Sequence, residues 1–372
     1  MENELYDAVN SVIRYNSKYS ELTRSLIKSF PEIKSRENVV FSPLSIIMLL
    51  GIVTESVDGS TRDEILKVLG EKYSYENLRS ILCDMQTLFS SDEKLTSSNA
   101  VCLKEEILKS INPDYEKKLE DFGGKLFATK DIVNTVNAWV KEKTKGMITN
   151  VANDSMKEML ACLLNAIAFE AEWMEEYEEE DIDEGVFNNA DGTTSDVQMM
   201  YSTEYSYLED SFFRGFAKSY KDGGYSFVAL LPKKKVPTFI NRSLDKLDIP
   251  GILKTSKYIK TFVTMPEFTC DYGANLTNLF KDMGINTVFS SNADFTPMTK
   301  EWVQLDSIIH KAHIEVDRKG TRAAAVTMGI VCAGCVPMEE EYKTIILDRP
   351  FIYAIVHNET KLPVFVGMMN HA

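Results

Sequence analysis

The sequence contains few histidines, and none of them stands in a catalytic pattern. Its 372 residues include only four histidines: His310, His313, His357 and His371. None of them lies near a Gly-x-Ser-x-Gly turn, and the chain has no glycine-rich phosphate loop. A hydrolase needs a nucleophile, a base and a residue that orients the base. We therefore do not expect an enzyme.

Long hydrophobic runs and excess positive charge are also missing. The longest apolar stretch, residues 39–53, contains Ser and Pro and is too short to span a bilayer. The net charge of -15 disfavours binding to nucleic acid or to anionic membranes. The start Met1–Glu4 is acidic and polar, unlike a secretory signal peptide. We expect a monomer that is cytoplasmic, exported by another route, or secreted if a signal peptide has been removed.

The six cysteines are few and scattered, which is typical of reduced, buried thiols in a large chain. One close pair, Cys332 and Cys335, has the spacing of a thioredoxin-type motif. The alternative of a thiol redox protein lacks that motif's strand-to-helix setting. A metal site is not expected either, because His310 and His313, which precede Glu315, would point to opposite faces of a strand.

One stretch, residues 323–338, contains no charged residue, although 26% of the chain is charged. Alternate residues from Thr321 to Ala333 are small or apolar, so one face of a strand could pack against a core. The stretch ends at Pro337 and the acidic run Glu339–Glu341, a pattern typical of a solvated loop. The segment is therefore compatible with both a buried strand and an exposed loop.

The motif GTRAAAVT, residues 320–327, resembles the hinge of the reactive-centre loop in serpins, usually written GTEAAAAT. Other segments resemble serpin motifs in the family's order, from about Leu5 to the end. They are NVVFSPLSI (38–46), STRDEI (60–65), VNAWVKEKTKGMI (136–148), LNAIAFEAEW (164–173), FNNADGTTSDVQMM (187–200), MPEF (265–268, where the family has PKF), and the C-terminal segments 348–356 and 362–368.

This resemblance implies an α+β serpin fold in one domain over residues 1–372. That fold has a large central, mostly antiparallel sheet, two further sheets, about eight or nine helices and an exposed reactive-centre loop over about residues 318–343. It also implies a protease inhibitor that acts as a suicide substrate. The target cleaves the loop, and the loop inserts into the sheet as a strand and traps the covalently bound protease. The alternatives are a non-inhibitory serpin, acting as a carrier or chaperone, and an inhibitor of a cysteine protease.

The family's spacing from Gly320 puts the reactive bond at Gly334–Cys335, with Cys335–Val336 and Met338–Glu339 as alternatives. Small residues favour an elastase-like target, whereas Met338 would suit a chymotrypsin- or cathepsin-G-like one. No Arg or Lys lies in this window, which disfavours trypsin-like targets. We also expect that a Cys332–Cys335 disulfide would silence the loop. Its geometry requires a turn, which Gly334 permits.

The resemblance assigns a hinge that enters the sheet: Gly320, Thr321, Arg322, Ala323, Ala324, Ala325, Val326 and Thr327. The family normally has Glu where this chain has Arg318 and Arg322. Arg322 would face outward after insertion. Arg318 replaces an acid that usually pairs with a base at the top of the sheet, so the hinge is loosened or its partner is exchanged.

Four further residues are implied to hold the central sheet. Ser42 is the expected cap of a helix that follows an apolar strand. Asn165 lies at the region where the sheet opens, with His310 as its partner in a structural role, and Trp173 lies where the loop first enters. No cofactor is implied. Residues 73–95 contain few basic side chains, so heparin activation is not expected.

Overall fold

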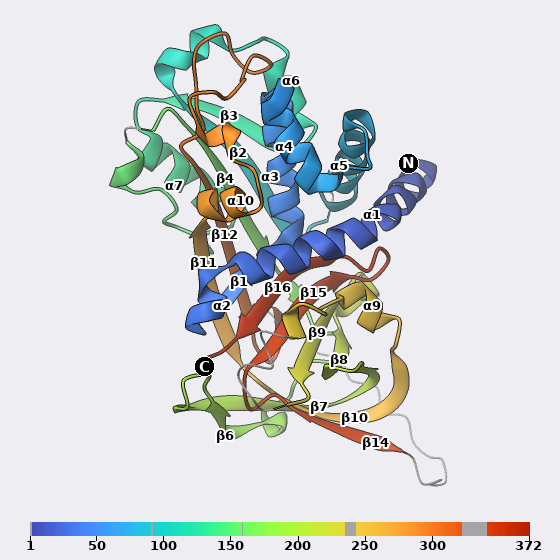
Figure 1. Cartoon of the computed structure of the whole chain (residues 1–372). Coiled ribbons are helices and arrows are strands. Elements are labelled where there is room, and N and C mark those ends of the chain that lie inside the picture. The colour runs from blue at the N-terminus through green and yellow to red at the C-terminus, as the bar shows by residue number, and fades with distance from the viewer. Residues whose placement is uncertain (1, 91, 158, 235–242, 322–340) are drawn as a thin grey trace. The chain divides into compact units, whose positions relative to one another are not determined.

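The computed structural model describes residues 2–90, 92–157, 159–234, 243–321 and 341–372 (Figure 1). The chain divides into two compact units. The first unit comprises residues 1–30, 41–168 and 271–313, and the second comprises residues 31–40, 169–270 and 314–372.

The first unit contains most of the helices. They are α1 (Glu2–Ser29), α3 (Pro43–Ser56), α4 (Gly59–Gly70), α5 (Tyr75–Ser90), α6 (Tyr115–Glu120), α7 (Ile132–Lys143) and α10 (Thr277–Asp282). Helix α3 is buried along its whole length, and Ser42 caps it as the sequence predicts. The segment from Ser60 lies within the first turn of α4, whose cap is Asp58, which accepts a hydrogen bond from the Gly59 N–H.

Within the described ranges, the first unit's part of the seven-stranded sheet contains, in order, β3 (Gly124–Thr129), β2 (Leu95–Lys104), β4 (Ala161–Phe169) and β12 (Ser307–Val316). Strand β11 (Phe268–Asn275) pairs with β12. Strand β4 is buried at every residue rather than alternately, because both faces of the sheet are covered. Two of its ladders are parallel: β2 pairs in parallel with β3, and β4 pairs in parallel with β12. The sequence led us to expect a mostly antiparallel sheet.

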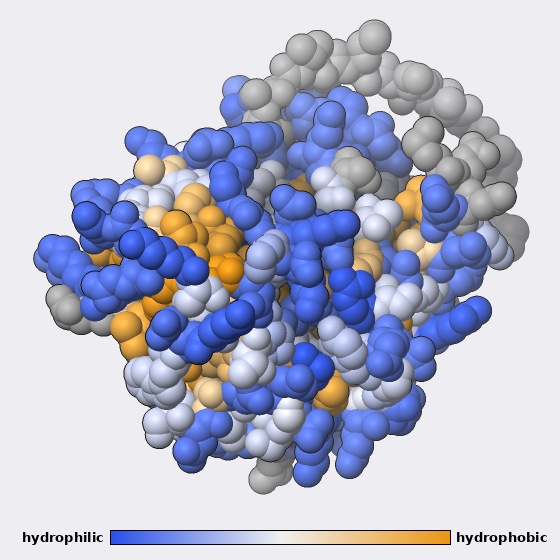
Figure 2. All heavy atoms as spheres, turned by 90° about the horizontal axis from the view of Figure 1, so that it is seen from above, coloured by the Kyte–Doolittle hydropathy of each residue, from blue (hydrophilic) through white to orange (hydrophobic). Residues whose placement is uncertain are grey.

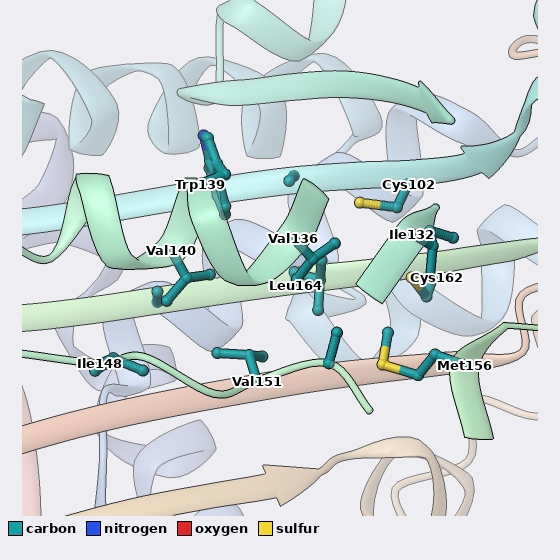
Figure 3. Close-up of a cluster of buried hydrophobic side chains, with 13 residues drawn as sticks. Cys102, Ile132, Val136, Trp139, Val140, Ile148, Val151, Met156, Cys162 and Leu164 are labelled. Atoms are coloured by element: carbon teal, nitrogen blue, oxygen red, sulfur yellow. The ribbon is translucent and has the colours of Figure 1, made fainter. Parts of the chain in front are cut away.

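A buried cluster lies between α7 and the strands β2 and β4 (Figure 3). It includes Val136, Trp139 and Val140 of α7 together with Cys102 and Cys162 of the two strands. The thiols of Cys102 and Cys162 hydrogen-bond to each other. This hydrogen bond and burial raise the pKa of Cys102. Four cysteines of the described residues, Cys83, Cys102, Cys162 and Cys270, are free thiols, as predicted.

The second unit is built on the nine-stranded sheet of the described residues. Its order is β1 (Val39–Phe41), β16 (Pro363–Met369), β15 (Phe351–His357), β9 (Tyr225–Pro232), β8 (Phe213–Ser219), β7 (Thr194–Glu209), β10 (Lys257–Pro266) and β14 (Tyr342–Ile346), with β6 (Ile182–Asn188) on β7. Helices α2 (Pro31–Ser35) and α9 (Ile249–Leu253) belong to the same unit. The two further sheets expected from the sequence are joined here, because β7 pairs with β6, β8 and β10.

The hydrophobic side chains lie mostly in the cores, and the face in Figure 2 is largely hydrophilic with smaller hydrophobic patches. Two of the motif segments form hairpins: β6 pairs with β7 across the Asp191–Gly192 turn, and β15 pairs with β16. Within the described residues, no helix combines the length and apolar character needed to cross a bilayer. These elements confirm the α+β architecture.

Candidate functional site

A chain of buried hydrogen bonds crosses the sheet of the first unit. The backbone N–H of Ser42 donates to His310 Nε2 (3.2 Å), and His310 Nδ1 lies 2.7 Å from Asn165 Oδ1. Asn165 Nδ2 donates to Asn99 Oδ1 (2.9 Å), and Asn99 Nδ2 donates to the carbonyl of Phe122 (3.2 Å). The network joins Asn165 to His310, its expected partner, and also includes the backbone N–H of Ser42. We call this chain the histidine relay.

The relay fixes the tautomer of His310. A backbone N–H can only donate, so Nε2 must be the acceptor and Nδ1 must carry the proton that it donates to Asn165. The side chain of His310 is completely buried, and burial lowers its pKa from 6.5 to about 3. His310 is therefore neutral at physiological pH, and every member of the relay donates in the same direction.

The first two hinge residues form a short strand in the second unit, β13 (Gly320–Thr321). This strand is antiparallel both to β12, where Val316 faces Thr321, and to β5 (Ala171–Glu172). Gly320 approaches β5 so closely that a Cβ atom would lie 2.2 Å from the carbonyl oxygen of Ala171. Only glycine fits there without a shift of the backbone.

Trp173 holds the turn that precedes this strand. Its indole Nε1–H donates to the carbonyl of Asp317 (2.8 Å), and its backbone N–H donates to that of Lys319 (2.9 Å). The carboxylate of Asp317 closes the turn by accepting from the backbone N–H groups of Lys319 (2.8 Å) and Gly320 (3.0 Å). The residue predicted to lie where the loop first enters thus contacts the base of that loop directly.

Two stacked aromatic rings lie next to Thr321. The rings of Trp173 and Tyr220 stack with centroids 4.5 Å apart and planes 10° apart. The Tyr220 hydroxyl lies 2.6 Å from Thr321 Oγ1, and burial raises the pKa of Tyr220. The ammonium of Lys218 lies over the Trp173 ring and pairs with Glu204 at 2.9 Å. We call Trp173, Tyr220 and Lys218 the tryptophan stack.

Arg318 lies beside acidic residues, whereas the acid that the family has at this position usually pairs with a base. Its guanidinium lies 3.7 Å from the carboxylate of Glu179, and its backbone N–H donates to the Glu267 carboxylate (3.2 Å). Glu267 is the residue of the MPEF segment that replaces the Lys of the family motif. Both positions therefore carry the opposite charge to that expected. The sequence contained this signal, but only the structure shows that the two positions are adjacent.

The remaining predicted residues lie outside the described residues. They are Arg322, Ala323, Ala324, Ala325, Val326 and Thr327 of the hinge, the reactive-bond residues Gly334, Cys335, Val336, Met338 and Glu339, and Cys332. The Nδ1 atom of His313 lies 2.6 Å from Asp271 Oδ1. Within the described residues, no group of three or more His, Cys, Asp or Glu is arranged to hold a metal ion.

The strand order, the short strand β13 and the histidine relay agree with the fold that the sequence motifs imply. The family model described as Serpin (serine protease inhibitor) matches residues 17–372. The chain therefore belongs to the serpin family, whose members are generally inhibitors of proteases rather than catalytic enzymes.

Individual relatives agree with this assignment. Leukocyte elastase inhibitor A of Mus musculus is 29% identical, over 93% of this chain and 95% of its own length. The thermophilic serpin tengpin in its native state is 30% identical and superposes with a TM-score of 0.86, covering 97% of this chain and 94% of tengpin. Human thyroxine-binding globulin complexed with its ligand is 22% identical with a TM-score of 0.84, over 97% and 99% of the two chains, and thus shares the fold.

Proposed function

We propose that this protein inhibits an elastase-like serine protease by acting as a suicide substrate. The protease nucleophile attacks Gly334–Cys335 in the reactive-centre loop and forms an acyl-enzyme. The freed loop then extends β13 into the sheet, and the displaced protease fails to complete deacylation. The protein is thus an inhibitor and not an enzyme.

The parallel pairing of β4 with β12 is the observation that carries this proposal. His310 of β12 faces Asn165 of β4 in this ladder. Strand β13 is already antiparallel to β12 and to β5, which follows β4 in the chain. Extension of β13 would separate β4 from β12 and replace one parallel ladder with two antiparallel ones, which are more stable per residue. This gain would contribute to the driving force for insertion.

The choice of target rests on the sequence of the loop and on one relative. Small residues surround Gly334, and the relative from Mus musculus is named as an inhibitor of leukocyte elastase. The partner is therefore a serine protease, with a cysteine protease as the other class to test. The protein acts as a monomer without cofactor or heparin, in the cytoplasm or after export without a signal peptide.

Incubation with a panel of elastase-like, chymotrypsin-like and papain-like proteases tests the proposal. We expect an SDS-stable complex with an elastase-like enzyme and cleavage after Gly334. The same enzyme with its nucleophile chemically blocked is the matched control and should give no complex. If every protease cuts the loop and remains active, the protein is a non-inhibitory serpin.

The cleaved chain supplies a second, independent readout. Insertion adds a strand to the sheet, so the cleaved form should melt at a far higher temperature than the intact form. Equal melting temperatures before and after cleavage would contradict insertion.

A further inference from the structure

One face of the second unit gathers exposed hydrophobic side chains. Of the thirteen large hydrophobic residues exposed in the described part of the chain, six lie on the three adjacent strands β7, β10 and β14. They are Tyr201, Tyr205, Tyr258, Phe262, Tyr342 and Ile346. We call these six residues the tyrosine face. Tyr258 is 86% exposed and Tyr342 is 63% exposed.

The strand register places five of these side chains on the same side of the sheet. Tyr258 lies beyond a register shift between Tyr258 and Thr261 and joins them through its ring contact with Tyr205. Thr264 of β10 lies opposite both Tyr201 and Ile346. Phe262, two residues earlier on the same strand, lies opposite Thr203 and Thr344. Residues that face each other across a ladder, or that are two apart on a strand, share a face. The hydrophobic groups therefore form a continuous surface rather than isolated exposures.

Ring contacts connect neighbouring side chains of this surface. The rings of Tyr205 and Tyr258 stack with centroids 5.2 Å apart, and Phe262 meets Tyr342 edge to face at 5.7 Å. The ammonium of Lys260 lies 5.5 Å from the centroid of the Phe262 ring. Aromatic side chains that are held in place before binding lose little conformational entropy on binding, which is why Tyr is enriched at the energetic centres of interfaces.

A cleft borders the stacked pair. It has a volume of about 540 Å³, and its lining includes Tyr205, Tyr258, Met174 and Thr203. Met174 is itself 58% exposed. A partner that rests on the tyrosine face therefore also meets a hollow that can accept a side chain, the arrangement in which interface anchors bury best.

The position of Tyr342 in the chain indicates which partner covers this surface. Strand β14 begins at Tyr342, directly after the reactive-centre loop. The bond Gly334–Cys335 precedes Tyr342 by only seven residues, an extended reach of at most about 24 Å. A protease domain of about 200 residues has a radius of gyration of roughly 17 Å and is thus about 40 Å across. A protease of that size that holds this bond must come close to Tyr342.

We propose that the tyrosine face is a second docking surface for the target protease, distinct from the reactive bond. This inference rests on the proposed inhibitory function. The protease would present an apolar patch to the stacked rings and place one side chain in the adjoining cleft. The face would then set the rate of association, and the loop would set the outcome after cleavage.

Inhibition kinetics with leukocyte elastase, pancreatic elastase and chymotrypsin separate these two contributions. The variants are Tyr205→Ser/Tyr258→Ser and the single Tyr258→Glu, whose side chain is too exposed for folding to depend on it. We expect the second-order association rate constant to fall about 10- to 100-fold for at least one elastase. The stoichiometry of inhibition and the SDS-stable complex should be unchanged, since the loop is intact.

Tyr6→Ser is the matched control, because Tyr6 on α1 is 67% exposed and lies on no strand of the tyrosine face. It should leave the rate constant unchanged. Rate constants within twofold of wild type in both test variants, for every protease that the wild type inhibits, would overturn the docking proposal and leave the inhibitory function standing. If the wild type inhibits no protease, the inhibitory function fails first, and the docking proposal falls with it.

Sedimentation velocity tests a second copy as the occupant. We expect the wild type and Tyr205→Ser/Tyr258→Ser to sediment alike as monomers. A wild-type dimer that this double variant converts to a monomer would assign the tyrosine face to self-association and overturn its assignment to the protease.

Discussion

The histidine relay of the first unit and the tryptophan stack of the second unit are both buried, but different forces hold them. The relay consists of polar groups whose donors and acceptors match in sequence from Ser42 to Phe122. The stack buries two large rings and adds a paired ammonium. The relay therefore depends on protonation state, and the stack depends on contact area. The following predictions separate these two dependences.

The largest effect is expected from truncation in the stack. Trp173→Ala removes a side chain that is 1% exposed and leaves a cavity, so the free energy of unfolding should fall by about 3–5 kcal/mol. Urea denaturation of the intact chain measures this loss. Trp302→Ala is the control, because Trp302 is 57% exposed and should change stability by less than about 0.5 kcal/mol. A loss below 1 kcal/mol for Trp173→Ala would show that the stack does not depend on contact area.

Thr321→Arg should be the next most disruptive change. Thr321 is completely buried in the intact chain, and an unpaired arginine there would cost about 3 kcal/mol of stability. It should also slow loop insertion, so that deacylation completes and the variant becomes a substrate. Titration against an inhibited protease should give a stoichiometry of inhibition at least about tenfold higher. Thr321→Ser retains the hydroxyl and should behave like wild type, whereas unchanged stoichiometry in Thr321→Arg would mean that Thr321 does not guide insertion.

The relay predicts a dependence of stability on pH. The pKa of His310 is lowered to about 3 in the folded chain, so between pH 6.5 and pH 3 the unfolded chain binds a proton that the folded chain does not. Stability is therefore lost as the pH falls below 6.5, by about 2 kcal/mol between pH 7 and pH 5. Urea unfolding at both pH values, for wild type and His310→Gln, isolates this contribution. Identical pH dependence in the two proteins would remove His310 as its source.

The smallest effect is expected at Arg318, whose side chain is 43% exposed. Arg318→Glu would place a third carboxylate beside Glu179 and Glu267 and should cost about 0.5–1 kcal/mol. The double variant Arg318→Glu/Glu267→Lys restores the family's arrangement of charges and should recover most of that loss. A double-mutant cycle in low salt measures the coupling. If the two changes are additive, the charges at positions 318 and 267 do not interact.

The sequence motifs predicted the members of the relay better than its physical state. Ser42 and Asn165 lie in family motifs, and the resemblance implies His310 as the partner of Asn165, whereas no motif indicated Asn99. The tautomer of His310 does not follow from the resemblance, because it depends on the backbone N–H of Ser42, which any residue except proline would supply. Tyr220 belongs to no recognised motif, and its contact with Thr321 joins residues that are far apart in the chain.

The exchanged charges at Glu267 and Arg318 show a different limit. Each departure from the family pattern is visible by itself, and Arg318 alone indicates a loosened hinge. Only the structure shows that the two positions are adjacent, through the hydrogen bond from the Arg318 backbone N–H to the Glu267 carboxylate. The tyrosine face was missed for a related reason. Its residues come from three separate strands, and single exposed aromatic residues in a sequence carry no signal until the register aligns them.

The register of β13 also assigns a place to a residue further along the loop. Thr321 lies between Val316 and Ala171. Six residues later, an uninterrupted antiparallel strand would bring Thr327 between His310 and Asn165, six residues back on either side. A hydroxyl both accepts and donates, so Thr327 Oγ1 would accept a hydrogen bond from His310 Nδ1–H and donate one to Asn165 Oδ1. The loop would thus bring with it a bridging group for the His310–Asn165 hydrogen bond, which its insertion breaks together with the β4–β12 ladder.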